Sequence, residues 1–388
     1  MGSNQTSDVN ERAMGAKAKH VIIAAQSIDH SAYLAGVPYQ RYFTDARIFA
    51  KTQLSVSNYY KFDAPSNTWD VYNIEAEAMG QKLVFPADGI PDADRTQPLI
   101  DSPASLDKIQ IPDPYTSGRM PWVHQINKAY LELIGRPARV FFCAPFSLAV
   151  NIRGYENLIM DILYNPEFAH RLFETLCDKI IAPYVQAMRN EIARPTALAD
   201  GNDAWASPPM ITLDIMENFV VRYAERLREA VGGNLVTRGN WGDSKGNDPD
   251  FAERFWALKL KACPGFLSVL DPDLYEVGPT RVKSFAQKHD AYVAAGVDAT
   301  LLKRGPVEAI IERIKQYIDA MARDGRCAIY LNQIPADTPP EHVHAAVAAC
   351  HTLGKYPIAE NLDEIQVQIP ERESFAEFLR RESETLES

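Results

Sequence analysis

The sequence predicts an α/β protein whose strands form a (β/α)8 TIM barrel, with additional N-terminal helices and long loops at the carboxyl-terminal barrel face. After residue 139, short apolar strands alternate with amphipathic helices at least six times, which is typical of parallel βα units. The 388 residues are a common length for one such barrel with insertions. No strand is followed by G-x-G-x-x-G, and G-x-x-x-x-G-K-[ST] is absent, so the usual open sheets that bind nucleotides are disfavoured.

The regular part of the chain begins with a buried strand at 139–146, predicted from its length and its β-forming residues. A helix follows at 165–188, where Asn165 is the expected N-cap and Pro166 the first helical residue. Further strands are expected at 196–200, 234–240, 265–271, 291–298 and 327–332. Further helices are expected at 213–231, 249–262, 279–289, 306–322 and 340–354, the last of which ends at a glycine.

The N-terminal third is less regular. Helices are expected at 47–58 and 71–79, and the segment 86–121 is rich in proline and aspartate. A long irregular stretch inside a compact chain is more often functional than a simple linker. Its apolar residues are expected to dock on a core: Leu99, Ile100, Leu106, Ile109 and Ile111.

The predicted domain organisation has three parts. Residues 1–19 are expected to be a disordered tail, 20–360 a single barrel domain, and 361–388 a C-terminal extension. No composition break demands a second domain. The last residues, 372–388, are expected to add only solvated charge.

Composition excludes several classes of function. Forty basic and fifty-one acidic residues give a net charge of −11, which argues against non-specific binding of nucleic acid or of an anionic membrane. No apolar run reaches the ~20 residues of a membrane helix, and we expect no secretory signal. The five cysteines are scattered without a C-x-x-C pair, so neither a disulfide framework nor a four-cysteine zinc site is expected. A reducing cytoplasm is therefore the expected compartment.

Polar and aromatic residues gather where the predicted strands end, and in TIM barrels the active site lies at those ends. The candidates for catalysis are Asp203, Asp243 and Asn240. The candidates for substrate binding are Trp205, Trp241, Arg238, Asp271, Asp298, Asn332, Tyr72, His124 and Cys143. Converging carboxyl groups raise one another's pKa, so one of them could serve as a general acid. Aspartates after strands are also frequent helix caps, and for Asp271 that alternative carries equal weight.

The histidines give no familiar metal motif. There is no H-E-x-x-H or H-x-H with both rings on one face, because His342 and His344 project about 200° apart on a helix. His351 lies near a helix end, and His124 is the histidine we expect to face a pocket. No metal site is predicted, and the absence of G-x-S-x-G leaves a hydrolase elbow unsupported.

Three segments together resemble the uroporphyrinogen decarboxylase superfamily. Residues 141–176 are similar to its small-residue strand followed by a helix after Asn-Pro-Glu. Residues 199–227 resemble its D-D-x-x-x-x-P-x-x-S-x-x-x-F pattern, and 330–349 its final I-P-x-D-T-P stretch. EAEAMG at 75–80, followed by a proline-rich stretch, is closer to the corrinoid-dependent methyltransferase branch. The resemblance covers about residues 45–358 and implies a TIM barrel.

Departures from the superfamily narrow the function. The R-Q-A-G-R-Y segment that grips porphyrinogen carboxylates is missing, and G-H-G is replaced by 332–334, Asn-Gln-Ile. The methyltransferases that activate coenzyme M hold zinc through H-x-C and a later Cys. The matching positions here are Val236, Arg238 and Asn332, so zinc is not expected at that site. Porphyrinogen decarboxylation and zinc-assisted thiol activation are both disfavoured.

The resemblance then implies a substrate-side methyltransferase of anaerobic metabolism. Such an enzyme moves a methyl group from a methoxyaromatic (O-demethylation), a methylated amine or a betaine to the Co(I) of a corrinoid (cobalamin) held by a partner protein. Trp and Tyr side chains could stack an aromatic ring or cage a quaternary ammonium. The alternatives are a metal-free decarboxylase or lyase of a small carboxylic acid, with Arg238 as anchor, and a non-catalytic binding protein. A homodimer is among the expected assemblies, because this superfamily often pairs.

Overall fold

The computed structural model describes residues 18–65, 69–246 and 248–387. The predicted tail therefore lies almost wholly outside the described residues. Contacts divide the chain into two compact units. We call Met1–Pro38, Lys51–Asn67 and Gly265–Ser388 the first unit, and Tyr39–Ala50 and Thr68–Pro264 the second unit. The expectation of one barrel domain over 20–360 stays a prediction.

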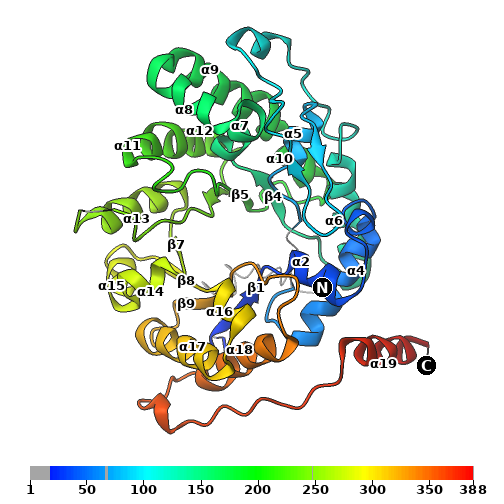
Figure 1. The fold of residues 1–388 in the computed structure, drawn as a ribbon, viewed down its shortest axis with the longest axis vertical. Helices are drawn as coiled ribbons and strands as arrows, with labels where there is room; N and C mark the ends of the chain where they lie inside the picture. Colours follow the sequence, from blue (N-terminus) through cyan, green and yellow to red (C-terminus); the bar gives the residue numbers. More distant parts are fainter. Residues whose placement is uncertain (1–17, 66–68, 247, 388) are drawn as a thin grey trace. The chain divides into compact units, whose positions relative to one another are not determined.

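The first unit contains a four-stranded parallel sheet in the order β1-β9-β8-β7 (Figure 1). Its strands are β1 (Ile22–Ala25), β7 (Phe266–Leu270), β8 (Tyr292–Val297) and β9 (Cys327–Leu331). Among the described residues, the first strand, β1, pairs with the last, β9, with Ile22 opposite Ala328. An open doubly wound sheet would place the first strand inside the sheet, whereas a barrel brings the first and last strands together. The strand order therefore agrees with the predicted barrel topology.

All six residues of β8 are buried, as expected for a parallel strand covered on both faces. The helices α17 (Val307–Met321) and α18 (Pro340–Leu353) lie against each other beside β8 and β9 (Figure 1). Gly354 is the C-cap of α18, as the sequence predicted. The other helices of this unit are α2 (Ile28–Leu34), α14 (Asp273–Val277), α15 (Pro279–Lys288), α16 (Ala299–Arg304), η4 (Leu362–Glu364) and α19 (Phe375–Glu387).

The second unit contains a three-stranded parallel sheet in the order β4-β5-β6. Its strands are β4 (Val140–Cys143), β5 (Ala199–Asn202) and β6 (Leu235–Arg238). The strand predicted at 196–200 is displaced, because the paired residues 200–202 are Asp-Gly-Asn and carry no apolar signal. Gly201 is needed in the middle of β5, since a Cβ there would lie 2.5 Å from the Phe142 ring. Between β1 and β4, the only strands of the described residues are β2 (Leu83–Val84) and β3 (Asp92–Ala93), which form a short antiparallel pair.

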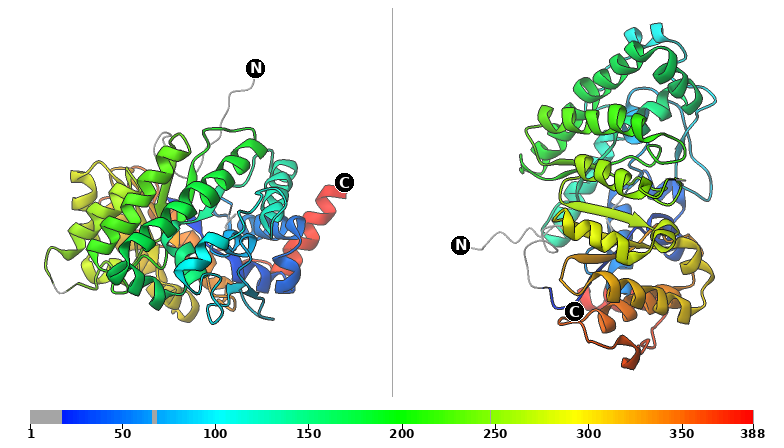
Figure 2. Two further views of the ribbon diagram at one scale, coloured as in Figure 1. Left: turned by 90° about the horizontal axis from the view of Figure 1, so that it is seen from above. Right: turned by 90° about the vertical axis from the view of Figure 1, so that its left-hand side faces the viewer.

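Two long helices of the second unit run side by side (Figures 1 and 2). One passes through α9 (Pro166–Thr175), η2 (Leu176–Ile181) and α10 (Ala182–Glu191). The other passes through α11 (Leu213–Ile215), η3 (Met216–Val221) and α12 (Arg222–Ala230). The Phe173 and Tyr223 rings stack between them with centroids 4.9 Å apart. The Asn165 side chain accepts a hydrogen bond from Phe168 N, which confirms the predicted N-cap.

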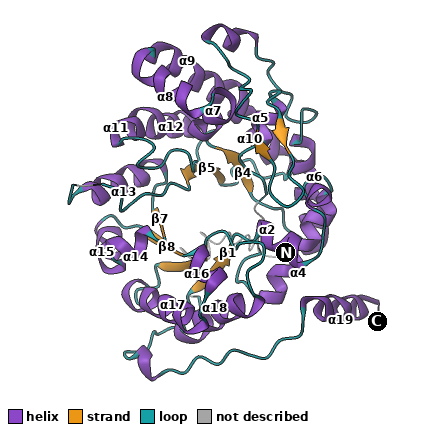
Figure 3. Cartoon of the chain, viewed as in Figure 1, coloured by secondary structure: helices purple, strands orange, loops and turns teal. Residues whose placement is uncertain are grey.

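The remaining helices cover the second unit and its irregular segment. They are α3 (Tyr39–Tyr42), α5 (Ile74–Ala78), η1 (Pro103–Lys108), α6 (Met120–Ile134), α7 (Pro145–Arg153), α8 (Tyr155–Tyr164) and α13 (Phe251–Ala262), while α4 (Ala46–Tyr60) contributes to both units. The segment 86–121 is mostly loop, as predicted (Figure 3). Ile100 and Leu106 are buried there, but Ile111 is 50% exposed, so the predicted docking holds only in part.

The C-terminal extension differs from its prediction. Residues 372–388 were expected to add only solvated charge, but α19 buries Phe375 and Phe378. Both rings pack against Tyr59 at 5.2 and 5.4 Å, and the Tyr59 hydroxyl donates to Glu373 O. Two aromatic residues one helical turn apart lie on the same face of a helix. The sequence obscures this pattern, because six of the other eleven residues of α19 are charged. The extension therefore belongs to the packed first unit.

Candidate active site

The carboxyl ends of β4, β5 and β6 bring several predicted site residues into one part of the second unit. Cys143 ends β4, Asp203 directly follows β5, and Arg238 ends β6. Asp203 N donates to Arg238 O over 2.8 Å, which extends the strand pairing as far as the carboxylate. Parallel strands necessarily present their carboxyl ends at one edge, so sequence reasoning could place these residues together.

Asp203 has the environment of a neutral carboxylic acid. Its Oδ1 accepts two hydrogen bonds from Ser147, one from N over 2.8 Å and one from Oγ over 2.7 Å. Its Oδ2 is buried and has no hydrogen-bond partner among the described residues. Burial raises the pKa of Asp203 to about 7, although both Ser147 donors lower it. The group can therefore hold a proton near neutral pH and release it within a small pH range.

The loop after β6 supports the loop after β5. The Asn240 side-chain amide donates to Asp203 O over 3.1 Å and to Ala206 O over 2.8 Å. Trp241 N donates to Ser207 Oγ over 3.0 Å, and the Trp241 side chain is partly exposed. Asn240 thus fixes the backbone that carries Asp203, which is a positioning role.

A second buried carboxyl group, Glu75 on α5, was missed by sequence reasoning. Its Oε1 accepts a hydrogen bond of 2.9 Å from Cys143 N, and its Oε2 is buried with no hydrogen-bond partner in the described part of the chain. Burial raises the pKa of Glu75 to about 8. The sequence offered a signal, because EAEAMG contains two acidic residues, Glu75 and Glu77, among the alanine and methionine residues of a short helix. Burial also raises the pKa of the Cys143 thiol well above its ordinary value, so that thiol is a poor nucleophile.

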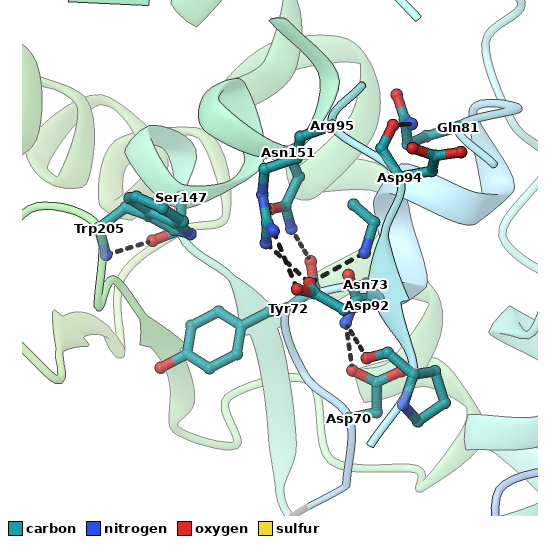
Figure 4. Close-up of polar contacts among 12 residues, drawn as sticks. Asp70, Tyr72, Asn73, Gln81, Asp92, Asp94, Arg95, Ser147, Asn151 and Trp205 are labelled. Carbon is teal, nitrogen blue, oxygen red and sulfur yellow. Dashed lines mark hydrogen bonds and ion pairs between the residues drawn. The ribbon is translucent and has the colours of Figure 1, made fainter. Parts of the chain in front are cut away.

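Trp205 lies among aromatic and cationic neighbours in the same unit. Its backbone N donates to Ser147 Oγ, the residue that also holds Asp203. The Arg95 guanidinium lies 5.1 Å from the Trp205 ring centroid, and the Tyr155 ring stacks on Trp205 at 5.8 Å. Tyr72 is half-buried, and its ring points toward the side on which Trp205 lies (Figure 4).

Arg95 was not among the predicted residues, although it lies in the irregular segment that was expected to be functional. Its guanidinium donates to both oxygens of Asp92 and to Asn151 Oδ1 (Figure 4). The Asn151 amide in turn donates to Tyr72 O over 2.6 Å. These contacts hold Arg95 in place against Trp205. They connect the loop that carries Arg95 with α7 and with the segment before α5.

Two other predicted residues of this unit form internal ion pairs. Arg238 donates to both carboxylate oxygens of Asp200, on the neighbouring strand. Asp243 is buried, and its Oδ1 accepts from Lys259 Nζ over 2.7 Å and from Trp256 Nε1 over 2.8 Å. These contacts favour a structural role for Asp243 and leave Asp203 as the stronger candidate acid.

His124 lies on α6 within side-chain packing. Its ring stacks on Tyr115 at 5.2 Å, and Nε2 donates to Pro114 O over 3.0 Å. Burial lowers the pKa of His124, so the ring is neutral at pH 7. These contacts give no sign that His124 faces a substrate.

Three predicted residues belong to the first unit. Asp271 follows β7, and its carboxylate accepts from Tyr317 OH, from Arg313 Nη1 over 2.6 Å and from Asp298 N over 3.2 Å. Asp298 is the N-cap of α16, where its Oδ1 accepts from Thr300 N. Asn332 follows β9 and is half-buried. The neighbouring Gln333 donates to Asp29, whose pKa burial raises to about 6.

Comparisons with known proteins identify the family of the chain. The model of the uroporphyrinogen decarboxylase (URO-D) family matches residues 24–242, more than half of the chain. The chain therefore belongs to the uroporphyrinogen decarboxylase family. A solved structure of a methyltransferase from Methanosarcina mazei is similar, with a TM-score of 0.68 and 16% sequence identity over 88% of this chain and 97% of that chain. A search of curated proteins found no match.

The family and the solved structure confirm two predictions made from sequence. The chain has the α/β fold of a TIM barrel, and it belongs to the uroporphyrinogen decarboxylase superfamily. Among the described residues, no helix is long and apolar enough to cross a membrane. The identity of the substrate and the roles of the site residues are not tested by these similarities.

Proposed function

We propose that this protein is a substrate-side methyltransferase that demethylates a methoxyaromatic compound. The methyl acceptor would be the Co(I) of a corrinoid carried by a partner protein. Asp203 carries this proposal, because it is a buried carboxylic acid with a pKa of about 7 and its Oδ2 has no hydrogen-bond partner among the described residues. Ser147 Oγ, which donates to Asp203, also accepts a hydrogen bond from Trp205 N. The family and the similar methyltransferase structure support the general class of reaction.

The reaction needs an acid because the leaving group is a poor one. A corrinoid on the partner protein would supply the electron pair that takes up the methyl group, and the carbon–oxygen bond of the substrate would break. The bond electrons stay on the aryl oxygen as a phenolate. The Asp203 carboxylic acid would give its proton to that oxygen, and water would later restore it. The products are a phenol and the methylated corrinoid, with cobalt formally oxidised to Co(III).

The surroundings of Trp205 favour an aromatic methyl donor over a quaternary ammonium. A cage for an ammonium ion needs aromatic faces that no other cation occupies. Trp205 already has the Arg95 guanidinium at 5.1 Å and the Tyr155 ring at 5.8 Å. A second cation beside Arg95 would be repelled, whereas a neutral methoxyaromatic ring would meet an apolar and polarisable wall.

The alternative of a metal-free decarboxylase or lyase relied on Arg238 as the carboxylate anchor. Arg238 is held by both oxygens of Asp200, so a substrate carboxylate would have to compete with an internal ion pair. The same competition applies to Arg95 and Asp92. The structure therefore offers less support for this alternative.

The test uses the purified full chain with cob(I)alamin under anaerobic conditions. It is supplied in parallel with methoxybenzoates, neutral methoxyphenols, methylated amines and betaines. Formation of methylcobalamin from the methoxyaromatics alone, followed by absorbance, is the expected result. Product from the amines or betaines would overturn the substrate assignment. Release of CO2 from an aromatic acid without cobalamin would overturn the reaction class.

The expected setting follows from the same proposal. Co(I) survives only in a reducing environment, and all five cysteines are free and buried. We therefore expect the protein to work in a reducing, anaerobic cytoplasm with its corrinoid partner. A homodimer stays a prediction.

A further inference from the structure

A group of two histidines and one aspartate lies in the first unit, away from the strand ends described above. His20 precedes β1, Asp63 follows α4, and His351 is in the last turn of α18. His20 is therefore at the amino end of β1, whereas Asp271, Asp298 and Asn332 follow the carboxyl ends of strands of the same sheet. Functional groups of TIM barrels gather at the carboxyl ends, while the amino ends serve stability.

The donor atoms of these three residues converge. His20 Nε2 lies 2.8 Å from Asp63 Oδ1, and His351 Nε2 lies 3.3 Å from Asp63 Oδ2. One donor atom from each residue can be chosen so that all three lie within 4.8 Å of one another. In a tetrahedral zinc site with bonds of about 2.0–2.1 Å, neighbouring ligand atoms are about 3.3 Å apart. Small side-chain rotations would therefore suffice to hold one ion.

We propose that His20, Asp63 and His351 form a structural site for a divalent transition metal ion, with Zn²⁺ as the best match. Two imidazole nitrogens and one carboxylate oxygen are a ligand set that Zn²⁺ accepts, with water in the fourth position. Mg²⁺ and Ca²⁺ prefer sites made of oxygen ligands and are poor candidates. Among the described residues, His20, Asp63 and His351 are the one group of three or more His, Cys, Asp or Glu side chains whose spacing suits a metal ion.

The carboxylate is prepared for this role by contacts that do not involve the histidines. Ile23 N donates to Asp63 Oδ2 over 2.8 Å, and Asp63 N donates to Ile23 O over 3.0 Å. Both contacts tie Asp63 to β1, and such hydrogen bonds orient metal ligands in known sites.

Backbone hydrogen bonds fix the segment around His20, and both histidine side chains remain accessible to solvent. Val21 N donates to Gly354 O over 2.8 Å, and Tyr356 N donates to Lys19 O over 3.0 Å, which fixes the backbone on both sides of His20. The neighbouring Cys350 thiol points to Val21 O at 3.3 Å and is not required as a ligand. Each histidine side chain keeps 29% of its surface exposed, so an ion and a water molecule can enter from solvent. A bound ion would connect β1, the end of α4 and the end of α18.

The experiment measures zinc uptake and thermal stability of the untagged full chain. After dialysis against a chelator and then against Zn²⁺, we expect one tightly bound Zn²⁺ per chain and a melting temperature raised by about 3 °C. Mg²⁺ at the same concentration should produce neither effect. His351→Ala and His20→Ala should weaken zinc binding at least ~100-fold, because loss of a ligand exceeds the ~10–100-fold cost of losing an outer-shell contact. His289→Ala is the matched control, since His289 is exposed in the same unit.

A second measurement on the unchanged protein guards against variants that fail to fold. Co²⁺ bound by two histidines, a carboxylate and water should give intense visible d–d bands that Zn²⁺ abolishes. Absence of these bands, or zinc binding that is equal in the wild type and both histidine variants, would overturn the proposal. In that case the three residues would only link their segments by hydrogen bonds.

Discussion

Two aspartates that follow parallel strands, Asp203 in the second unit and Asp271 in the first, have opposite surroundings. The Asp203 carboxyl receives both of its side-chain hydrogen bonds on Oδ1, from Ser147, and its Oδ2 has no partner. The Asp271 carboxylate accepts a hydrogen bond from the Tyr317 hydroxyl on Oδ1. Its Oδ2 accepts hydrogen bonds from Arg313 and from Asp298 N. Burial raises the pKa of both groups, but at Asp271 a guanidinium and two further donors oppose that rise.

The difference separates a group that can exchange a proton from one that holds structure together. A buried carboxyl group with few hydrogen-bond donors around it is easily protonated, because little stabilisation of the charged form is lost. A buried carboxylate paired with arginine is stabilised in its charged form by that partner, because protonation would leave the guanidinium without compensation. Both residues are aspartates that directly follow a parallel strand. Only the hydrogen-bond donors around each carboxyl group distinguish a proton donor from a structural carboxylate.

Asp203→Asn should have the largest effect on activity. The amide cannot give up a proton to the leaving oxygen, so we expect the rate of methyl transfer to fall by ~10²–10⁴-fold. Unfolding by urea should change by less than about 1 kcal/mol, because Asn keeps an acceptor for Ser147. An activity within a factor of a few of the wild type would remove Asp203 from the mechanism.

Asp271→Asn should show the reverse pattern. Removing the charge leaves Arg313 poorly compensated, which should lower the free energy of unfolding by about 3 kcal/mol. Urea denaturation followed by circular dichroism measures this loss, and Arg313→Met in the same background should recover part of it. If stability stayed unchanged while methyl transfer disappeared, the contrast between the two aspartates would be reversed.

The pH dependence of the rate should report the Asp203 carboxyl group. Its acid form is the reactive one, so the rate should be constant well below pH 7 and fall as the pH rises through about 7. Well above that point, the decrease should approach tenfold per pH unit. A rate measured with cob(I)alamin from pH 5.5 to 9 tests this, and an activated methyl donor that needs no acid should flatten the profile.

Ser147→Ala should have the smallest effect and sharpen the comparison. The Ser147 hydroxyl lowers the pKa of Asp203 by donating to the ionised form. Its loss should move the midpoint of the pH–rate profile upward by about one unit, toward the behaviour of a carboxyl with even fewer donors. Thr at the same position should keep the midpoint close to that of the wild type, which separates the hydroxyl from packing. A midpoint that moved downward would contradict this account.

The sequence by itself determined the alternation of strands and helices, the barrel class and the nomination of Asp203, Asn240 and Trp205. These follow from local information, because apolar periodicity and capping residues act over a few positions. Local information failed where polar residues pair in a strand, as at 200–202, and where two phenylalanines dock a charged helix, as in α19.

Tertiary structure decided which candidate side chains have partners and which do not. Asp243 gained Lys259 and Asp271 gained Arg313, while Asp203 and Glu75 each kept one buried oxygen without a partner. His20, Asp63 and His351 meet although 43 and 288 residues separate the aspartate from the two histidines. Such meetings depend on long-range packing, because hydrogen bonding and desolvation are set by neighbours in space and leave no trace in local sequence.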